Sequence, residues 1–460
     1  MDLTTTLPVA IIGAGPVGLA AAAHLLERGL EPLILEAGAT PAAAIEQWRH
    51  IRLFSPWRYN TDAAAVRLLE ATGWESPEPS ALPTGGELID QYLTPLVALP
   101  AIASRLQTGA RVVAVTRLGM DKTHSRNRDA TPFVVRVEHA DGEVRDHRAA
   151  AVIDASGTWS TRNPLGTSGL PPVGEAAAAY RISSPLPDVL GRDREAFAGR
   201  TAVVVGAGHS AANTLINLAE LADQVPGTKI VWAIRGASAA KVYGGGDADG
   251  LAARGQLGSR LRSLVESGAV ELHTGFGIAA LAAAGAVTLT SADGRTLEAD
   301  VVVPATGFRP DLDFLRELRL ELDPGVEAAR ELGPLIDPEF HSCGTVEPHG
   351  AKVLAHPERD FYIVGMKSYG RAPTFLLATG YEQVRSVAAA LAGDREAADT
   401  VQLELPETGV CSSDIGTSCD VPVAANAGFV AESDGGCCGT PEPVLVGFPT
   451  GLAHGRSGAN

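Results

Sequence analysis

Two glycine-rich turns and one group of cysteines are the parts of this sequence whose residue types and spacing could carry chemistry. The first turn, Gly13-Ala14-Gly15-Pro16-Val17-Gly18, follows the apolar run Val9–Ile12. In such a turn the first glycine permits a tight bend, the second lets backbone amides approach a pyrophosphate, and the third lets a helix pack on the strand. Glu36, 23 positions after Gly13, is placed to accept hydrogen bonds from a ribose, with Ala37 beside it. These residues predict a dinucleotide site.

A second turn, Gly206-Ala207-Gly208-His209-Ser210-Ala211, follows the apolar run Thr201–Val205. Alanine in the third position still allows close helix packing. The next apolar run closes on Arg235 rather than on an acid, and a guanidinium can pair bidentately with the 2′-phosphate of NADPH. The turn therefore predicts NADPH in preference to NADH, with a solvated arginine as the alternative. His209 is either a phosphate contact or a neutral residue at a helix start.

Four of the five cysteines lie in the last 60 residues, which are rich in Gly, Ser, Pro and Thr: Cys411, Cys419, Cys437 and Cys438. The vicinal pair is flanked by glycines, so it is predicted to be accessible and could act as a redox shuttle. Thiolates are also preferred ligands of soft ions, so three of these cysteines could hold trivalent arsenic. Exposed thiols with no task are the alternative.

The fifth cysteine falls among three histidines. The four residues are Cys343, His341, His349 and His356. Their spacing matches no familiar metal site, so an ordinary polar loop is the favoured interpretation and no firm metal site is predicted.

The elements that must position these residues alternate between strands and helices. Each glycine turn stands between a short apolar strand and a helical stretch, to about Arg28 in the first case and over 212–222 in the second. Residues 42–107 are predicted to be mostly helical. Further strands are predicted at 33–35, 111–117, 133–138, 151–154, 230–234, 300–303 and 361–365, with a hairpin at Asp141-Gly142 and a helix from about 374 to 391. The pattern predicts an α/β fold with two Rossmann-like domains, the second inserted in the first.

The predicted organisation has five parts. They are 1–165, the first part of the domain that carries the first glycine turn; 166–198, a connector; 199–304, an NAD(P)H-binding domain; 305–395, the second part of the first domain; and 396–460, a flexible tail that contains cysteines.

Composition excludes some partners. The net charge of −17 disfavours nucleic acid and anionic membranes. The apolar stretch Pro8–Leu26 is interrupted by three glycines and a proline, which indicates a strand, turn and helix rather than a membrane span. The start of the chain has no basic region typical of a secretory signal. We expect a cytoplasmic protein with a small-molecule substrate. A homodimer is one assembly that the sequence allows.

A chain with two dinucleotide-binding units, each built on a strand, a glycine turn and a helix, resembles the flavoproteins with two dinucleotide-binding domains. Ala155-Ser156-Gly157 and Ala305-Thr306-Gly307 both follow buried strands, where the chain of this superfamily crosses between domains, and Phe361–Gly365 resembles its last FAD-domain strand. The resemblance implies FAD at the first turn, so that 1–165 and 305–395 form an FAD-binding domain. It also implies a helix after Pro373 whose N-terminus points at the flavin pyrimidine ring. Many members have Asp after the glycine, where this chain has Met366. Implied cofactor contacts are Ala155, Gly157, Gly307 and Gly365.

The sequence leaves two interpretations of the electron acceptor open. The order of domains, Trp48–Pro56 and Ala305–Pro310 resemble flavin-containing monooxygenases, which implies oxygen as acceptor. The F-x-G-x-x-x-H segment of that family is not matched by Tyr180–Pro187. Trp48 and Trp57 could shield a flavin from water or could be ordinary core residues.

The other reading is a disulfide or metalloid reductase. Residues 1–342 contain no cysteine, so only the tail can supply a redox dithiol, and its vicinal pair resembles those of mercuric reductases and some thioredoxin reductases. The two domains, Leu53–Trp57 and the cysteine tail together resemble the flavoproteins encoded beside bacterial arsenic-resistance genes (the ArsO type). This implies a monooxygenase-like enzyme of arsenic or thiol detoxification, in which the flavin itself is the catalytic group. A metalloid-binding carrier is the non-enzymatic alternative.

Overall fold

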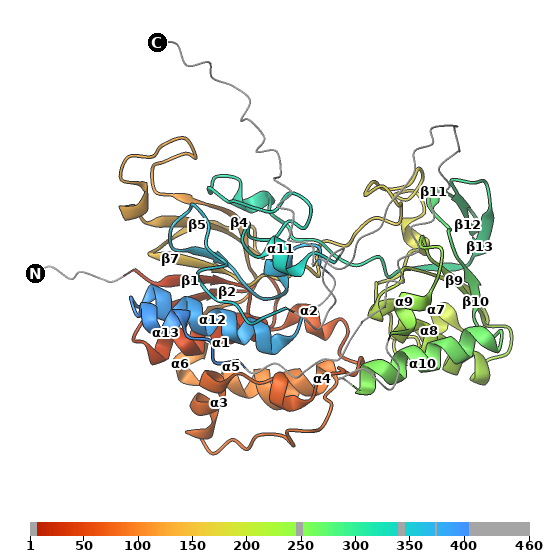
Figure 1. The fold of residues 1–460 in the computed structure, drawn as a ribbon, viewed down its shortest axis with the longest axis horizontal. Coiled ribbons are helices and arrows are strands. Elements are labelled where there is room, and N and C mark those ends of the chain that lie inside the picture. Colours follow the sequence, from red (N-terminus) through yellow and green to blue (C-terminus); the bar gives the residue numbers. More distant parts are fainter. Residues whose placement is uncertain (1–6, 245–251, 339–345, 373–374, 404–460) are drawn as a thin grey trace, which may run out of the picture. The chain divides into compact units, whose positions relative to one another are not determined.

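The computed structural model describes residues 7–244, 252–338, 346–372 and 375–403 of the 460-residue chain. They form two parallel sheets, each covered by helices on one face and by an antiparallel sheet on the other (Figure 1). The strands of the second parallel sheet lie in the sequence between β7 (Ala151–Asp154) and β15 (Phe361–Ile363) of the first. The predicted α/β fold, with one dinucleotide-binding unit inserted in another, is confirmed.

The first sheet has five parallel strands in the order β15-β7-β1-β2-β3. Its remaining members are β1 (Val9–Ile12), β2 (Pro32–Leu35) and β3 (Leu106–Gln107). Val9 and Ile11 belong to the core on the helical side, whereas Ala10 and Ile12 belong to the core on the other side. Because the strand is buried on both faces, its sequence is apolar throughout rather than alternating.

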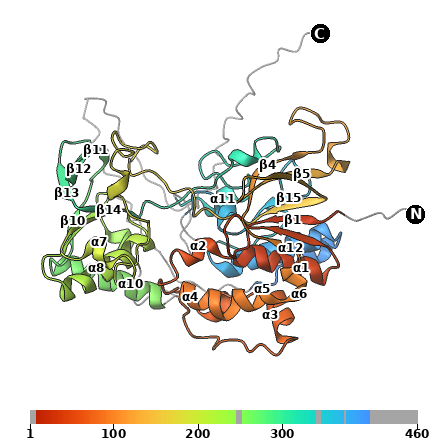
Figure 2. The ribbon, with the colours of Figure 1, turned by 180° about the vertical axis from the view of Figure 1, so that it is seen from behind.

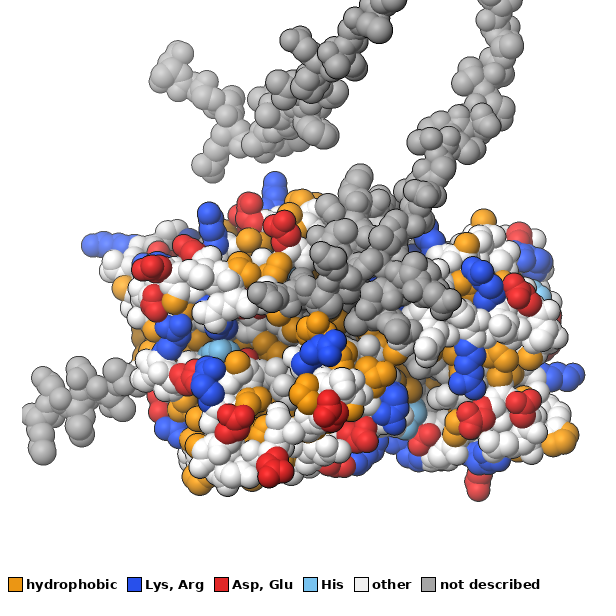
Figure 3. Space-filling model, turned by 60° about the horizontal axis from the view of Figure 1, so that its bottom comes forward, with side chains coloured by type: hydrophobic (Ala, Val, Ile, Leu, Met, Phe, Trp, Pro, Cys, Tyr) orange, Lys and Arg blue, Asp and Glu red, His pale blue; other side chains and the backbone are white. Residues whose placement is uncertain are grey.

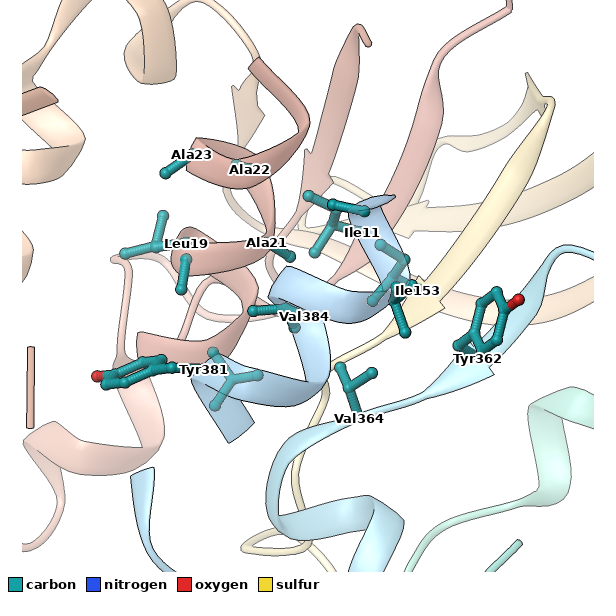
Figure 4. Close-up of a cluster of buried hydrophobic side chains, with 14 of the residues drawn as sticks. Ile11, Leu19, Ala21, Ala22, Ala23, Ile153, Tyr362, Val364, Tyr381 and Val384 are labelled. Carbon is teal, nitrogen blue, oxygen red and sulfur yellow. The ribbon is translucent and has the colours of Figure 1, made fainter. Parts of the chain in front are cut away.

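Helices α1 (Pro16–Glu27) and α12 (Leu377–Leu391) cover one face of this sheet in both views (Figures 1 and 2). Ala20–Ala23 are fully buried, and their small side chains let the two helices approach each other and the sheet. Helix side chains meet strand side chains in one cluster (Figure 4), which includes Leu19, Val384, Ile11 and Ile153.

An antiparallel sheet covers the opposite face of the first sheet. It consists of β4 (Ala110–Arg117), β5 (Phe133–His139) and β6 (Val144–Ala149). Phe133, Val135 and Val137 of β5 are buried while the residues between them are not, which is the alternation expected of a strand with one buried face. The predicted hairpin between the last two strands turns at Asp141-Gly142, where Gly142 has a φ of +83°.

The second parallel sheet repeats this plan. Its order is β10-β9-β8-β14, with β8 (Thr201–Val205), β9 (Lys229–Ala233), β10 (Glu271–His273) and β14 (Val301–Pro304). Helices α8 (His209–Gln224) and α10 (Ala252–Glu266) pack on one face. The antiparallel strands β11 (Ile278–Ala284), β12 (Ala286–Ser291) and β13 (Thr296–Ala299) pack on the other.

The predicted helical region 42–107 consists of short pieces. They are α2 (Ala43–Glu46), a 3₁₀ turn (Trp57–Tyr59), α3 (Ala63–Glu70), α4 (Gly85–Leu88), a π turn (Ile89–Leu93), α5 (Thr94–Ala98) and α6 (Pro100–Ala103). Three of them (α4, the π turn and α5) run on without a break from Gly85 to Ala98. The other short helices are α7 (Arg194–Phe197), α9 (Ala240–Tyr243), α11 (Gly333–Ile336) and α13 (Arg395–Asp399), with 3₁₀ turns at Arg128–Ala130, Ala179–Arg181, Asp313–Leu315 and Gly365–Tyr369.

Helix α13 covers the first residues of the segment predicted to be a tail. Ala398 is buried, and the guanidinium of Arg385 donates hydrogen bonds to the carbonyl oxygens of Ala397 (2.7 Å) and Thr400 (2.6 Å). The packed structure therefore continues to at least residue 400.

The surface and helix lengths bear on the predicted partners. Basic and acidic side chains are interspersed on the face shown in Figure 3, without a continuous basic patch there. In the part of the chain that the structure describes, no helix is both long and apolar enough to cross a membrane.

One buried carboxylate ties three separate segments of the first unit together. Glu358 accepts hydrogen bonds from Arg117 (2.7 Å) and Arg128 (2.8 Å) and from the backbone N–H of Arg319 (3.0 Å). All three side chains of the ion cluster are at most 3% exposed. Burial alone would raise the pKa of Glu358, but the hydrogen bonds from Arg128 and Arg117 outweigh it and hold this pKa below its usual value.

Glu358→Gln should lower the free energy of unfolding at pH 7 by about 3–5 kcal/mol, because it leaves two guanidinium groups buried without a counterion. A carboxyl group whose pKa is lower in the folded state stabilises above its unfolded pKa, and this stabilisation is lost as the pH falls through the folded pKa. The difference from wild type should therefore shrink in acid. Urea unfolding at pH 7 and pH 3 measures it, with Glu143→Gln of the exposed Glu143–Arg145 pair as control. Equal losses in both variants would contradict the account.

Candidate functional site

The first glycine turn joins β1 to α1 and has no room for a side chain at two of its glycines. Gly13 has a φ of +99°, and a Cβ there would lie 2.8 Å from the carbonyl oxygen of Ala155. A Cβ at Gly18 would overlap the carbonyl oxygen of Gly13. At Gly15, in contrast, a Cβ would meet no heavy atom within 4 Å, so this side of the turn is open.

The open side of the turn fits a dinucleotide pyrophosphate. Gly15 is the N-cap of α1, Pro16 is in its first turn, and no side chain caps the helix. The first N–H groups of a helix lack partners within it and attract phosphate oxygens. The predicted contacts at Ala14 and Val17 lie in the same turn.

Glu36 holds the turn from the neighbouring strand. One carboxylate oxygen accepts a hydrogen bond from the N–H of Ala14 (2.7 Å) and the other from the N–H of Gly38 (2.7 Å). A carboxylate has about four acceptor positions, so positions remain for the predicted ribose hydroxyls. Ala37 follows at the carboxyl end of β2.

Other predicted FAD contacts lie at the same edge of the first sheet. Ala155 and Gly157 follow β7, and Gly157 has a φ of +70°. Gly365 follows β15 with a φ of +68°, and a Cβ there would lie 3.3 Å from Val17 of the first turn. The residues that follow β2, β7 and β15 therefore lie near the first turn, at the edge of the sheet where parallel α/β sheets bind ligands.

A buried ion pair at this edge was not predicted from the sequence. The ammonium group of Lys367 donates to Asp154 (2.6 Å) and Ser156 (3.1 Å) and lies 4.3 Å from the ring centroid of Phe314. Both charged side chains are 0% exposed. The pair joins the ends of β7 and β15, one residue beyond the half-buried Met366. A lysine in an otherwise apolar segment was the available signal, but its partner is 213 positions away.

Gln383 of α12 fixes the backbone of Gly365. Its amide oxygen accepts from the Gly365 N–H (2.8 Å), and its amide nitrogen contacts Ser368 (2.9 Å) and His349 (2.9 Å). The other ring nitrogen of His349 lies 3.0 Å from the carbonyl oxygen of Glu347. Burial lowers the pKa of His349, against the opposing effect of that hydrogen bond, so a neutral imidazole completes the network.

The start of α12 is close to the first turn. The helix begins at Leu377, three residues later than predicted, and Pro373 and Thr374 lie outside the described residues. A Cβ at Gly380 would lie 2.7 Å from a methyl carbon of Val17, so glycine is required where α12 crosses the first turn. This contact supports the expectation that α12 begins near the cofactor.

A small, mainly apolar cavity of about 100 Å³ lies beside the start of α12. It is lined by Leu53, Phe54, Ser55, Asn60, Phe375, Leu376 and Leu377. Trp57 is 4% exposed and belongs to the core, and half-buried Trp48 packs against Trp159, so neither lines this cavity.

The second glycine turn has the same constraints as the first. Gly206 has a φ of +133°, and a Cβ there would overlap the carbonyl oxygen of Ala305. Gly208 is the N-cap of α8 and open, and Ala211 is fully buried. The carbonyl oxygen of Gly206 accepts a hydrogen bond from the indole of Trp232 (2.7 Å).

The polar residues predicted around the second turn lie at its open side. His209 and Ser210 are the first two residues of α8, and the His209 ring packs on Phe54, with 5.1 Å between centroids. Arg235 is exposed just beyond the carboxyl end of β9. This is the edge of the sheet where the second turn also lies.

The two crossings between the units pair with each other. Asn163 donates its N–H to the carbonyl oxygen of Gly307 (2.9 Å), and Arg309 donates its N–H to that of Thr161 (3.0 Å). The rings of Trp159 and Phe308 stack across this ribbon at 4.9 Å. The predicted cofactor residue Gly307, which has a φ of +81°, lies in this short antiparallel ribbon because its carbonyl oxygen accepts the hydrogen bond from Asn163.

The remaining candidates are not brought together. His349 and His356 hydrogen-bond to different backbone carbonyls, and within the described residues no cluster of metal-ligating side chains occurs. His341 lies outside those residues, as do all five cysteines, including Cys411, Cys419, Cys437 and Cys438. The predicted thiol site therefore lies outside the described residues and stays a prediction.

The fold and its paired glycine turns define a two-domain dinucleotide-binding oxidoreductase. Residues 7–331 match the family model of the pyridine nucleotide-disulphide oxidoreductases, and the chain belongs to this family. It is accordingly an FAD-dependent enzyme that uses NAD(P)H. No curated protein matches the sequence.

Solved structures share the fold at low sequence identity. The bacillithiol disulfide reductase of Bacillus cereus is 18% identical with a TM-score of 0.62, covering 85% of this chain and 99% of its own. The desferrioxamine-pathway cadaverine monooxygenase of Erwinia amylovora is 14% identical with a TM-score of 0.58, covering 94% and 100%. A flavin-containing monooxygenase of Stenotrophomonas maltophilia is 22% identical with a TM-score of 0.50, covering 85% and 99%.

Gly15→Ala should separate cofactor binding from folding. The added methyl group meets no protein atom within 4 Å, but it points to the side where a pyrophosphate would lie. We expect the melting temperature of the apoprotein to change by less than about 2 °C and the FAD dissociation constant to rise about tenfold or more. Differential scanning fluorimetry and flavin fluorescence titration measure the two. Unchanged FAD affinity would refute the assignment, and Gly18→Ala should lower apoprotein stability instead.

Proposed function

We propose that this enzyme is a monooxygenase. NADPH, a proton, O2 and a small-molecule substrate give NADP⁺, water and the substrate carrying one oxygen atom. FAD supplies the two-electron carrier between NADPH and oxygen. Gly13, Gly15, Gly18 and Glu36 would hold it, and the second turn would hold NADPH.

The observation that carries this proposal is the apolar cavity beside the start of α12. This pocket is partly open to solvent, and its mainly apolar walls offer water few hydrogen-bond partners. Exclusion of water protects reactive oxygen chemistry from side reactions. Five of the seven lining residues are leucine or phenylalanine. The cavity lies next to the helix whose N-terminus is expected to face the flavin ring.

The two polar residues of the lining satisfy each other. Ser55 donates its hydroxyl to the side-chain oxygen of Asn60 (2.9 Å). The Asn60 amide donates to the carbonyl oxygens of Ser55 (2.6 Å) and Pro56 (3.1 Å). The Tyr381 hydroxyl donates to the Asn60 carbonyl oxygen (2.8 Å). With these bonds made, the wall offers water few free partners.

Trivalent arsenic or a thiol is the proposed substrate class. Support comes from the sequence, since Cys437 and Cys438 form a vicinal pair suited to soft ions. An uncharged organoarsenical with apolar substituents also suits a pocket with apolar walls.

A disulfide or metalloid reductase is the second candidate. The family match and the fold shared with a bacillithiol disulfide reductase support it. It requires a redox dithiol, and residues 1–342 contain none, so Cys437 and Cys438 would have to accept the electrons. The metalloid-binding carrier stays a hypothesis that the family match gives no reason to prefer.

The finer assignments are proposals of the same kind. We propose the predicted domain boundaries, a cytoplasmic location and a homodimer. NADPH preference is supported by Arg235, which is exposed at the carboxyl edge of the second sheet where a 2′-phosphate could reach it.

Oxygen uptake distinguishes the two functions. With NADPH and either arsenite or methyl phenyl sulfide as probe, we expect one O2 consumed per NADPH and label from ¹⁸O2 in the arsenate or the sulfoxide. The double variant Cys437→Ser, Cys438→Ser should keep sulfide oxygenation. The reductase would replace the proposal if no labelled product formed and the wild type reduced a model disulfide anaerobically. That reduction should then disappear in this variant but persist in the control Cys411→Ser, Cys419→Ser.

Arg235→Ala should raise KM for NADPH about tenfold and leave KM for NADH within about twofold, because only NADPH has the 2′-phosphate. Lys229→Ala is the matched control, since Lys229 is an exposed cation at the opposite end of the same strand β9. Steady-state NAD(P)H oxidation measures both. A parallel rise for both nucleotides would contradict the specificity role.

A further inference from the structure

The ring of Phe54 contacts both candidate sites. On one side it lines the apolar cavity beside α12. On the other it packs against the imidazole of His209, with 5.1 Å between ring centroids and 45° between ring planes. His209 is the first residue of α8, immediately after Gly208 of the second glycine turn.

The segment that carries Phe54 is held on both sides. Leu53 donates its N–H to the carbonyl oxygen of Pro83 (2.8 Å), and Trp57 donates its N–H to that of Ala81 (2.9 Å). The Ser55–Asn60 hydrogen bond closes the turn between them. Because this backbone is fixed, the ring of Phe54 can respond to His209 mainly by changing its own rotamer.

His209 stands where a bound nucleotide would act. The first residues of α8 face the open side of the turn at Gly208, where a pyrophosphate would be attracted to the helix N-terminus. A nucleotide bound there would lie beside His209, the first residue of the helix. Through its ring contact with Phe54, His209 is in turn next to a residue of the cavity wall.

We propose that Phe54 is a positioning residue that couples NADP(H) binding at the second turn to the affinity of the apolar cavity for its ligand. With nucleotide bound, His209 holds the Phe54 ring in the wall and the cavity retains small apolar molecules more tightly. Without the nucleotide the cavity retains these molecules less tightly. The inference rests on the proposed function only in treating this cavity as the substrate cavity.

Coupling of this kind is reciprocal and is measured without turnover. If NADP⁺ strengthens binding of a cavity ligand by some factor, that ligand strengthens NADP⁺ binding by the same factor. Benzene is a suitable probe because it is small, apolar and unreactive here. Calorimetric titration of the FAD-loaded enzyme with benzene, with and without saturating NADP⁺, gives the factor. We expect about fivefold tighter binding with NADP⁺.

Two variants change the same cavity in the same way. Phe54→Leu removes the ring that contacts His209, and Phe375→Leu removes a ring that contacts Tyr369 instead. We expect both to alter benzene affinity, but only Phe54→Leu should bring the coupling factor to about one. Phe54→Tyr keeps a ring against His209 and should restore the coupling. FAD content is measured for each variant, and Phe54→Met replaces Phe54→Leu if its FAD content falls.

The outcomes decide the inference. No benzene binding by the wild type, no effect of NADP⁺, equal coupling in Phe54→Leu and wild type, or equal loss in Phe375→Leu would each overturn it. The assay involves neither oxygen nor a disulfide, so a reductase could still show the coupling, and a proven monooxygenase could still lack it. Failure here is therefore distinct from failure of the proposed function.

Discussion

The structure depends on how closely the backbone approaches itself at the two glycine turns. At each turn the first glycine lies directly against the carbonyl group of the residue with which the chain leaves the sheet, Ala155 in one case and Ala305 in the other. No side chain fits between them. The same contact that shapes each proposed phosphate site therefore also fixes where the chain crosses from one unit to the other. Cofactor binding and domain connection share one steric constraint, used twice.

The sequence was sufficient for features that are local. A strand, a glycine turn and a helix lie within about 20 residues, and their glycines are required by contacts inside the same unit or with the adjacent strand. The two sheets, the insertion and the placement of Glu36 and Arg235 at strand ends were predicted for this reason. The lengths of the helices between residues 42 and 107 were not predicted. Short apolar runs there are interrupted by prolines and glycines, whose effect depends on the neighbouring segments.

The features that sequence reasoning missed join residues far apart in the chain. Lys367 finds Asp154 across 213 positions, and Glu358 finds Arg117 across 241. Each residue alone resembles an ordinary surface charge. Burial of a charge is tolerated only with a partner, and the partner becomes visible only after the fold has brought the strand ends together. The cavity is another such feature, since its walls come from residues 53–60 and 375–377.

The pairing of the two crossings also has a mechanical consequence. Thr161–Asn163 and Gly307–Arg309 are hydrogen-bonded to each other, and Trp159 stacks on Phe308 across them. Two separate tethers would let one unit swing and twist about several axes. Two crossings that are hydrogen-bonded to each other move together, so they restrict twisting and separation of the two units more than two unpaired segments would. A displacement of either crossing must therefore carry the other crossing with it, so the two units are joined at this point by one paired connection rather than by two independent ones.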